Sequence, residues 1–476
     1  MDQVEEFFVK ASDLVWSEPL LILLLGGGAF FMIYSRFLPF KYFGHAVAVL
    51  RGKYDDPDKP GQISHFEALS GAIAATVGMG NISGVALAIV AGGPGAIFWM
   101  WISAVFGLAT KFFTCTLAVK YRSKDSEGEV QGGPMYVITE GLGKKWKPLA
   151  IFFAIAGMFG ATPVFQANQM VAAFKDVALP HLAGAGDTFW IDLVIGLVIA
   201  ALVAMVILGG IKRIGSVASK MVPAMVVLYV VSVLAILLLN YDKVIPSLAM
   251  IITDAFPANP FGDYEITGFL SIFNLKALFG GALGAIIIEG GKRAAFSNEA
   301  GIGTAPMMHG AAKTDEPIRE GLVAMLGPAI DTLVICTMTG LCIIITDSYL
   351  LDESNGITLT AQAFGESLPG IGKYILLTCV MVFAITTIFG LAYYAVKCFS
   401  FLVGPKIGWY FNYWYVILVI IGSVVSLDIV VNFVFVAYGL MSIPTMISAI
   451  LLAPKVLKEA KSYFGRLAAG EMVKRN

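Results

Sequence analysis

The sequence predicts an all-α, polytopic membrane protein with eleven transmembrane helices. Three observations predict it: the chain is 58% hydrophobic, it is only 14% charged, and its mean hydropathy is +0.81. Soluble domains carry about 25% charged residues, so this chain has too few to cover a water-exposed surface of its size. Several apolar runs reach the ~20 residues that cross a bilayer as a helix, and none alternates with the period of a strand. Lipid is therefore the expected surrounding, and nothing indicates a nucleic-acid partner.

The elements follow from the hydropathy pattern, which places spans at 16–38, 66–91, 94–121, 148–175, 188–210, 216–240, 269–296, 319–346, 371–398, 407–426 and 429–453. Of the 32 Lys and Arg residues, 26 lie in alternate loops or in the C-terminal tail. Basic loops stay on the cytoplasmic side of a membrane. The pattern therefore predicts an N-terminus outside and a C-terminus in the cytoplasm.

After the first span, ten remain, five within 66–240 and five within 269–453. An odd number of spans reverses orientation, so the two groups are predicted to be an inverted repeat within one transmembrane domain, with 16–38 as an extra helix. Each group opens on a helix interrupted by glycines, ATVGMGNISG (75–84) and LFGGALGAIIIEGG (278–291). Close helix packing explains an isolated glycine pair, but the matched positions favour two broken helices. The second break is expected near Gly280 to Gly284. Gly290 and Gly291 offer another break but lie too near the cytoplasmic end of the span to match the first, and the exact position stays open.

A break exposes peptide groups that need partners in lipid. Free N–H groups at the start of a half-helix attract a carboxylate, and free C=O groups at the end of one coordinate a cation. An amino acid together with a cation would satisfy both.

Three segments resemble the alanine or glycine:cation symporter family, which are prokaryotic sodium-coupled amino acid carriers. They are GGPGAIFWMWISAVFG (92–107), FSNEAGIGTAP (296–306) and GPAIDTLVICTMTG (327–340), within a similarity that covers 66–453. The resemblance implies a cell-membrane transporter and not an enzyme, with alanine or glycine as substrate and sodium co-transported. The family is more distantly similar to the leucine-transporter fold of neurotransmitter:sodium symporters, in the amino acid/polyamine/organocation superfamily.

The leucine-transporter resemblance implies the cation ligands. A first sodium would take the carbonyl oxygens of Ala74, Val77 and Phe383 and the hydroxyl groups of Thr386 and Thr387. A second sodium would lie between the Thr76 carbonyl and the Asn81 side chain. Carbonyl and hydroxyl oxygens suit such a cation, although threonine hydroxyls in membrane helices often bond only their own helix.

The same resemblance places the substrate carboxylate at the N–H groups of Gly78, Met79 and Gly80, beside Thr76 and Asn81. In the fourth span Phe165 and Gln169 share one helix face and Gln166 is adjacent. Either amide is expected to bond the substrate, with Phe165 as a lid or as core. In the seventh span Phe279, Gly281 and Leu283 are expected to narrow the pocket.

Three ionisable residues lie within spans. For Asp331, near the middle of the eighth span, three roles stay open: it binds a cation, bonds the broken helices or carries a proton. Glu289 is expected to pair with Lys292 or Arg293 near the cytoplasmic end of its span. Lys111 is expected to extend its ammonium to the membrane surface.

Other functions are weighed against sodium symport. A proton-coupled transporter of the same fold would use a lysine on the sixth span, where Lys220 lies near the start. An intramembrane enzyme would need clustered catalytic groups, such as a His–Glu pair, and the sequence indicates none. A channel is disfavoured because two inverted breaks suit an occluded site. Sodium stoichiometry, stereoselectivity and oligomeric state stay open.

Overall fold

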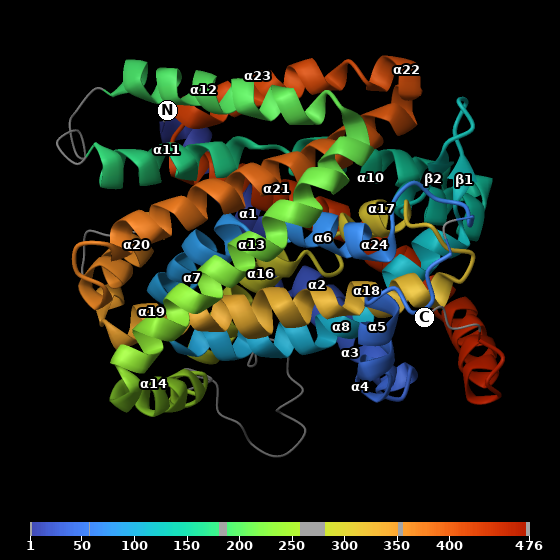
Figure 1. The fold of residues 1–476 in the computed structure, drawn as a ribbon, viewed down its shortest axis with the longest axis horizontal. Coiled ribbons are helices and arrows are strands. Elements are labelled where there is room, and N and C mark those ends of the chain that lie inside the picture. Colours follow the sequence, from blue (N-terminus) through green and yellow to red (C-terminus); the bar gives the residue numbers. More distant parts are fainter. Residues whose placement is uncertain (1, 57, 180–187, 258–280, 351–355, 473–476) are drawn as a thin grey trace.

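The computed structural model describes residues 2–56, 58–179, 188–257, 281–350 and 356–472, which form a bundle of helices (Figure 1). The first part of the chain contains α1 (Asp2–Val15), α2 (Glu18–Leu21), η1 (Ile22–Gly26), α3 (Gly27–Tyr34), α4 (Leu38–Lys41), α5 (Phe43–Leu50), α6 (His65–Thr76), α7 (Met79–Gly92) and α8 (Gly95–Lys120). A hairpin of β1 (Ser123–Lys124) and β2 (Val130–Gln131) follows, with Ser123 opposite Gln131.

The middle of the chain continues with α9 (Pro134–Tyr136), η2 (Val137–Leu142), η3 (Lys144–Trp146), α10 (Lys147–Gly160), α11 (Val164–Ala178), α12 (Phe189–Ile207), α13 (Gly210–Leu239) and α14 (Tyr241–Thr253). The last part contains α16 (Ala282–Asn298), α17 (Ala305–His309), α18 (Pro317–Pro328), η6 (Ala329–Cys336), α19 (Thr337–Ile345), η7 (Ser348–Leu350), α20 (Gly356–Ser367), α21 (Gly372–Val403), α22 (Pro405–Gly408), α23 (Phe411–Val424) and α24 (Leu427–Ala468).

In the described part of the chain, nine helices are long and apolar enough to cross a membrane. The bent pair Gln3–Val15 and Glu18–Tyr34 is a tenth candidate. These ten correspond to ten of the eleven predicted spans. The predicted span 269–296 lies partly outside the described residues, so the total of eleven and the orientation of the ends stay predictions.

Burial separates the central helices from the outer ones. The apolar window of His65–Gly92 is 89% buried, whereas the windows of Phe189–Ile207 and Gly210–Leu239 are 28% and 33% buried. In Figure 1, α6, α7 and α16 lie inside the bundle, with α12 and α23 together along one edge and α8 and α18 along the opposite edge. The outer helices are apolar on their exposed faces, as expected of helices in contact with lipid.

Two span boundaries differ from the prediction for local reasons. The fourth span is interrupted between α10 and α11 at Thr162 and Pro163, where proline has no N–H for the helix and restricts the residue before it. The last span continues to Ala468 instead of ending near 453. Hydropathy falls there because the segment is amphipathic, but its apolar side still packs on the N-terminal part, with Phe464 stacked on Tyr42 at 3.6 Å between ring centroids.

Candidate substrate and cation site

The first predicted helix break is confirmed at Val77 and Gly78, between α6 and α7. The Gly78 N–H donates to the Asn81 side-chain oxygen at 2.9 Å. In an unbroken helix that N–H would bond the Ala74 carbonyl four residues earlier. The break therefore frees the Ala74 carbonyl. It also leaves the N–H groups of Met79 and Gly80, at the start of α7, without a carbonyl of their own helix.

The break is packed tightly against α21. A Cβ on Gly78 would lie 2.2 Å from the Thr387 hydroxyl oxygen, so the chain needs glycine there. The hydroxyls of Thr386 and Thr387 each donate to the Phe383 carbonyl at 2.9 Å. The groups predicted for the first sodium thus lie on two segments in contact. Their hydroxyl bonds are also those that threonine makes in any apolar helix, so the cation site itself stays a prediction.

The second break lies elsewhere than predicted. The chain is continuously helical from Ala282 through Gly284 to Asn298, and the interruption comes after Asn298, before α17. Glu299, Gly301 and Gly303 have φ values of +55°, +87° and +106°, which no α-helix contains. A break at Gly284 is therefore excluded, because Gly284 lies inside α16. Gly281 is the non-helical residue before α16, and Gly280 lies outside the described residues, so the prediction for that part of the segment is not tested.

This shift removes part of the predicted pocket. A Cβ on Gly80 would lie 3.2 Å from the Ser297 Cα, so the first break faces the C-terminal end of α16. Leu283 precedes Ser297 by fourteen residues, or about 21 Å of helix. Gly281 and Leu283 therefore do not reach either of the two breaks, and Phe279 lies outside the described residues.

The predicted position of Glu289 and its neighbours also differs from the structure. Glu289 lies against Gly92, at the end of α7 farthest from His65, whereas the prediction placed it on the side of the bundle where His65 lies. Its predicted pairing is confirmed with Arg293, and Lys292 lies over the Phe435 ring at 4.5 Å. Lys292 and Arg293, which were counted among the 26 basic residues of the alternate loops and tail, are thus buried in the bundle.

The two broken helices run in opposite directions past each other. The helix before the first break, α6, packs on α17, which follows the second break. The helix after the first break, α7, packs on α16, which precedes the second break. The half-helix before one break therefore packs beside the half-helix after the other break.

A single carboxylate bonds both breaks. Asp331 is fully buried in η6, a π-helical segment. Its Oδ1 accepts from Asn81 Nδ2 at 2.7 Å, and its Oδ2 accepts from Ser297 Oγ at 2.8 Å. Of the three roles left open for Asp331, the bonding of the two broken helices is therefore observed.

The next residue extends this contact. The Thr332 hydroxyl donates to Asp331 Oδ2 at 2.8 Å and accepts from Asn298 Nδ2 at 2.9 Å. Asn298 is the last residue of α16, so the π-helical segment holds the second break at two positions. The sequence pointed to neither Ser297 nor Thr332, although both lie inside the segments FSNEAGIGTAP and GPAIDTLVICTMTG.

Two further charges lie buried in the same region. Glu299 accepts hydrogen bonds from Tyr438, at 2.7 Å, and from Thr304. Lys111 is only 2% exposed and does not extend to the surface, contrary to the prediction. Its electrostatic neighbours are Glu299 and Asp331. A buried cation beside two buried carboxylates lowers the free energy of keeping all three charges out of water.

The fourth span contributes its predicted residues to the buried interior. Phe165 packs edge-to-face on Phe296, with 5.2 Å between ring centroids, next to Gly80. Gln169 accepts from the Ser83 hydroxyl at 2.6 Å, which joins α11 to α7. The side-chain oxygen of Gln166 is buried and has no hydrogen-bond partner among the described residues. Gln166 is therefore the amide with a group still available to a ligand.

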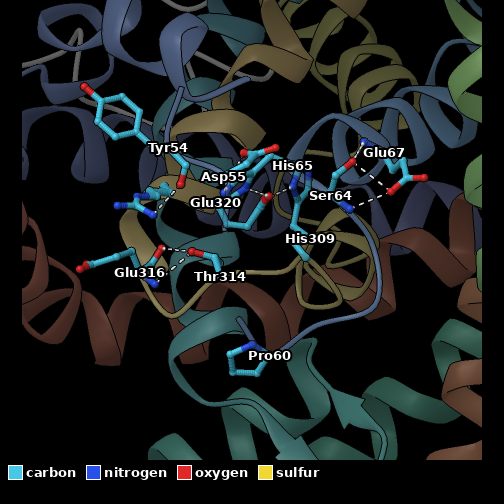
Figure 2. Close-up of polar contacts among 12 residues, drawn as sticks. Tyr54, Asp55, Pro60, Ser64, His65, Glu67, His309, Thr314, Glu316 and Glu320 are labelled. Atoms are coloured by element: carbon cyan, nitrogen blue, oxygen red, sulfur yellow. Dashed lines mark hydrogen bonds and ion pairs between the residues drawn. The ribbon is translucent and has the colours of Figure 1, made fainter. Parts of the chain in front are cut away.

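A second buried polar cluster, absent from the sequence prediction, lies at the other end of α6. Figure 2 shows Glu320 between His65 and His309, with Asp55 beside His65. These residues are separated by up to 265 positions in the chain. Sequence spacing gives no signal for such a contact, which is why a His–Glu pair was not expected.

Antiparallel broken helices that meet at a buried polar centre define the class of secondary membrane transporters. A crystal structure of MhsT in complex with L-phenylalanine has the same fold, with a TM-score of 0.58 over 85% of this chain and 93% of that one, at 13% identity.

The sequence model of the sodium:alanine symporter family matches residues 1–476, and the chain belongs to that family. Members of this family are transporters and not enzymes. It is 39% identical to the sodium/alanine symporter AgcS of Methanococcus maripaludis, over 95% of both chains. It is also 34% identical to the probable sodium/glutamine symporter GlnT of Bacillus subtilis, over 99% of this chain and 93% of that one.

Proposed function

We propose that this protein takes up alanine and glycine together with sodium, by alternating access around its two broken helices. The observation that carries the proposal is that the Asp331 carboxylate bonds residues at both breaks. A change of charge at this carboxylate therefore affects the position of both broken helices. A prokaryotic cell membrane, with the N-terminus outside, is the proposed location. The antiparallel packing of α6 with α17 and of α7 with α16 supports the inverted repeat of 66–240 and 269–453.

The first sodium is proposed at the end of α6. The freed carbonyl of Ala74, the carbonyl of Val77 and the partial negative charge of the helix end favour a cation there. Phe383, Thr386 and Thr387 supply oxygens from α21. The tight contact between Gly78 and Thr387 supports this assignment, since it fixes the spacing of the two segments.

The substrate is proposed to lie at the start of α7. Its carboxylate would accept from the Met79 and Gly80 N–H groups, where the helix dipole is positive. Gly78 is less available than predicted, because its N–H is already donated to Asn81. Phe296 lies against Gly80 and packs on Phe165, and these bulky neighbours favour a substrate with a small side chain.

A second sodium is proposed between Thr76, Asn81 and Asp331. Asp331 adds the negative charge that the first two groups lack. In the structure the Asn81 oxygen faces Gly78 and its NH₂ group faces Asp331. Binding of a cation beside Asp331 would replace the Asn81 N–H as the partner of Oδ1, and would thereby alter the contact between the first break and η6.

Proton coupling through Lys220 is not favoured. Lys220 is exposed, and the buried lysines of the described helices are Lys111, Lys292 and Lys397, on α8, α16 and α21. None of them lies on α13, where a lysine would replace the first sodium.

The test is uptake of labelled alanine into liposomes that contain the purified protein, with and without a sodium gradient. Glycine, glutamine and phenylalanine serve as competitors. Sodium-dependent uptake that is inhibited by glycine and much less by phenylalanine is expected. Uptake that is undiminished without sodium would refute the proposal that sodium is the coupling ion. Stronger inhibition by glutamine than by glycine would refute the proposal that the substrates are alanine and glycine.

A further inference from the structure

The cluster at the foot of α6 has an unusual hydrogen-bond pattern. Nδ1 of His65 lies 2.8 Å from Glu320 Oε1, and Nδ1 of His309 lies 3.1 Å from Glu320 Oε2. All three side chains are at most 1% exposed. A carboxylate only accepts hydrogen bonds, so both rings must carry a proton on Nδ1. In neutral rings, Nε2 is then an acceptor.

Neither Nε2 atom has a hydrogen-bond partner among the described residues, although both are buried. Asp55 Oδ1 lies 3.8 Å from His65 Nε2 and is also without a hydrogen-bond partner among the described residues. Two acceptors therefore face each other. One proton taken from water by His65 Nε2 would convert this pair into a donor and an acceptor, with no other bond changed. The 38% exposure of Asp55 gives that proton a route from solvent.

The charge balance favours this protonation. With neutral histidines, the cluster buries the net negative charge of Glu320, and buried unpaired charge is unfavourable. A proton on His65 makes an imidazolium between Glu320 and Asp55. The other charged or titratable groups that act on the cluster are Arg319 on α18, and Arg122 and Cys115 on the side of α8. Arg319 and Arg122 donate to the carbonyls of Tyr54 and Ala312, respectively.

The cluster joins three helices at one end of the bundle. His65 begins α6, His309 ends α17, and Glu320 belongs to α18. The chain segments next to them are paired as well, since Gln62 N–H donates to the Ala311 carbonyl at 2.7 Å and Lys313 N–H donates to the Ile63 carbonyl at 2.7 Å.

We propose that His65, Glu320 and His309 form a proton-binding site separate from the amino acid and sodium sites, and that a bound proton holds α6 and α17 against α18. The proton on His65 Nε2 adds an ion pair with Asp55 and neutralises the charge of Glu320, so opening at this end requires its release. The consequence for transport rests on the proposed function: acid on this side, predicted to be the cytoplasm, slows the opening that releases alanine and sodium.

Hydrogen–deuterium exchange of the full-length purified protein, without alanine, tests the site directly. Raising the pH from about 6 to about 8, across the ordinary range of histidine, is expected to increase exchange in 60–76 and 305–314 about tenfold after correction for intrinsic rates. Glu320→Gln and His65→Gln are expected to abolish this dependence. Asp55→Asn, at a partly exposed position, is expected to shift its midpoint to lower pH.

His45→Gln is the matched control, because His45 lies at the same end but bonds Tyr463 and not Glu320. It is expected to keep the wild-type dependence. A pH-independent wild type would overturn the proposal, as would an unchanged midpoint in Asp55→Asn and His65→Gln. Those two variants carry the test if Glu320→Gln does not fold. Absence of alanine uptake with a normal exchange profile would refute the proposed function alone.

Discussion

Asp331→Asn separates the two contributions of the buried carboxylate. The substitution keeps the shape but places an NH₂ group opposite the Asn81 NH₂, 2.7 Å away in the wild type, or opposite the hydroxyls of Ser297 and Thr332. One buried hydrogen bond is lost and one donor is left unsatisfied, which destabilises the fold by roughly 2–3 kcal/mol. The melting temperature is expected to fall, without loss of the folded state.

The loss of charge has a larger effect on sodium. At a contact distance of about 4 Å and an effective dielectric constant of about 20, a carboxylate stabilises a monovalent cation by about 4 kcal/mol. Since each 1.4 kcal/mol is tenfold, the sodium concentration for half-maximal alanine uptake is expected to rise by up to about a thousandfold.

The assay is alanine uptake into liposomes as a function of sodium concentration, with melting temperature measured in parallel. Glu299→Gln is the control, because Glu299 is equally buried but bonds Thr304 and Tyr438 instead of Asn81. It is expected to lower stability with a much smaller change in sodium dependence. A wild-type sodium dependence in Asp331→Asn would show that the carboxylate only joins the helices.

The remaining substitutions test the neighbouring groups. Asn81→Ala leaves the Gly78 N–H and Asp331 Oδ1 without their partner and is expected to reduce uptake at least tenfold; wild-type uptake would contradict the proposed site. Gly78→Ala is expected to abolish uptake and lower the melting temperature, because its Cβ overlaps the Thr387 hydroxyl; Thr387→Ser should retain activity, whereas Thr387→Val should raise the sodium requirement. Outside the spans, burial opposes ionisation of Asp315, but the Lys59 ammonium at 2.6 Å holds the pKa of Asp315 below its ordinary value. Stability from this pair is present above the ordinary carboxyl pKa and lost as the pH falls, and because both side chains are exposed, Asp315→Asn should change the melting temperature little.

The first break was predictable from the sequence and the second was not. Gly78, Gly80 and Asn81 stand inside a long apolar run, where they contradict the helical pattern. Around the second break, Asn298, Glu299 and Gly303 come at the polar end of the run, where hydropathy places an ordinary helix terminus. Gly281 and Gly284 resemble the first break more closely, but Gly281 is the residue before α16 and Gly284 lies inside that regular helix.

The site was predicted only in part, because its residues make contacts between segments that are far apart in the chain. The residue types were visible: Asp331 was singled out because a carboxylate is costly in a membrane helix. Its partners Ser297 and Asn81 are separated from it by 34 and 250 residues. Periodicity describes one helix at a time, so it does not indicate which helices enclose a given carboxylate. For the same reason Lys111 was expected at the surface, although α8 is packed between α16 and α18.

The π-helical turn of η6 also determines which way the two ends of its span face. Before it, α18 packs on α8 and α5; after it, α19 packs on α7, α13 and α20. Each residue of an α-helix turns the chain by about 100°, so deleting one residue to restore α-helical pitch would rotate the Ile-rich end of α19 by that angle relative to α18. The wide turn thus gives one span two differently oriented packing faces, with Asp331 at the point where the orientation changes.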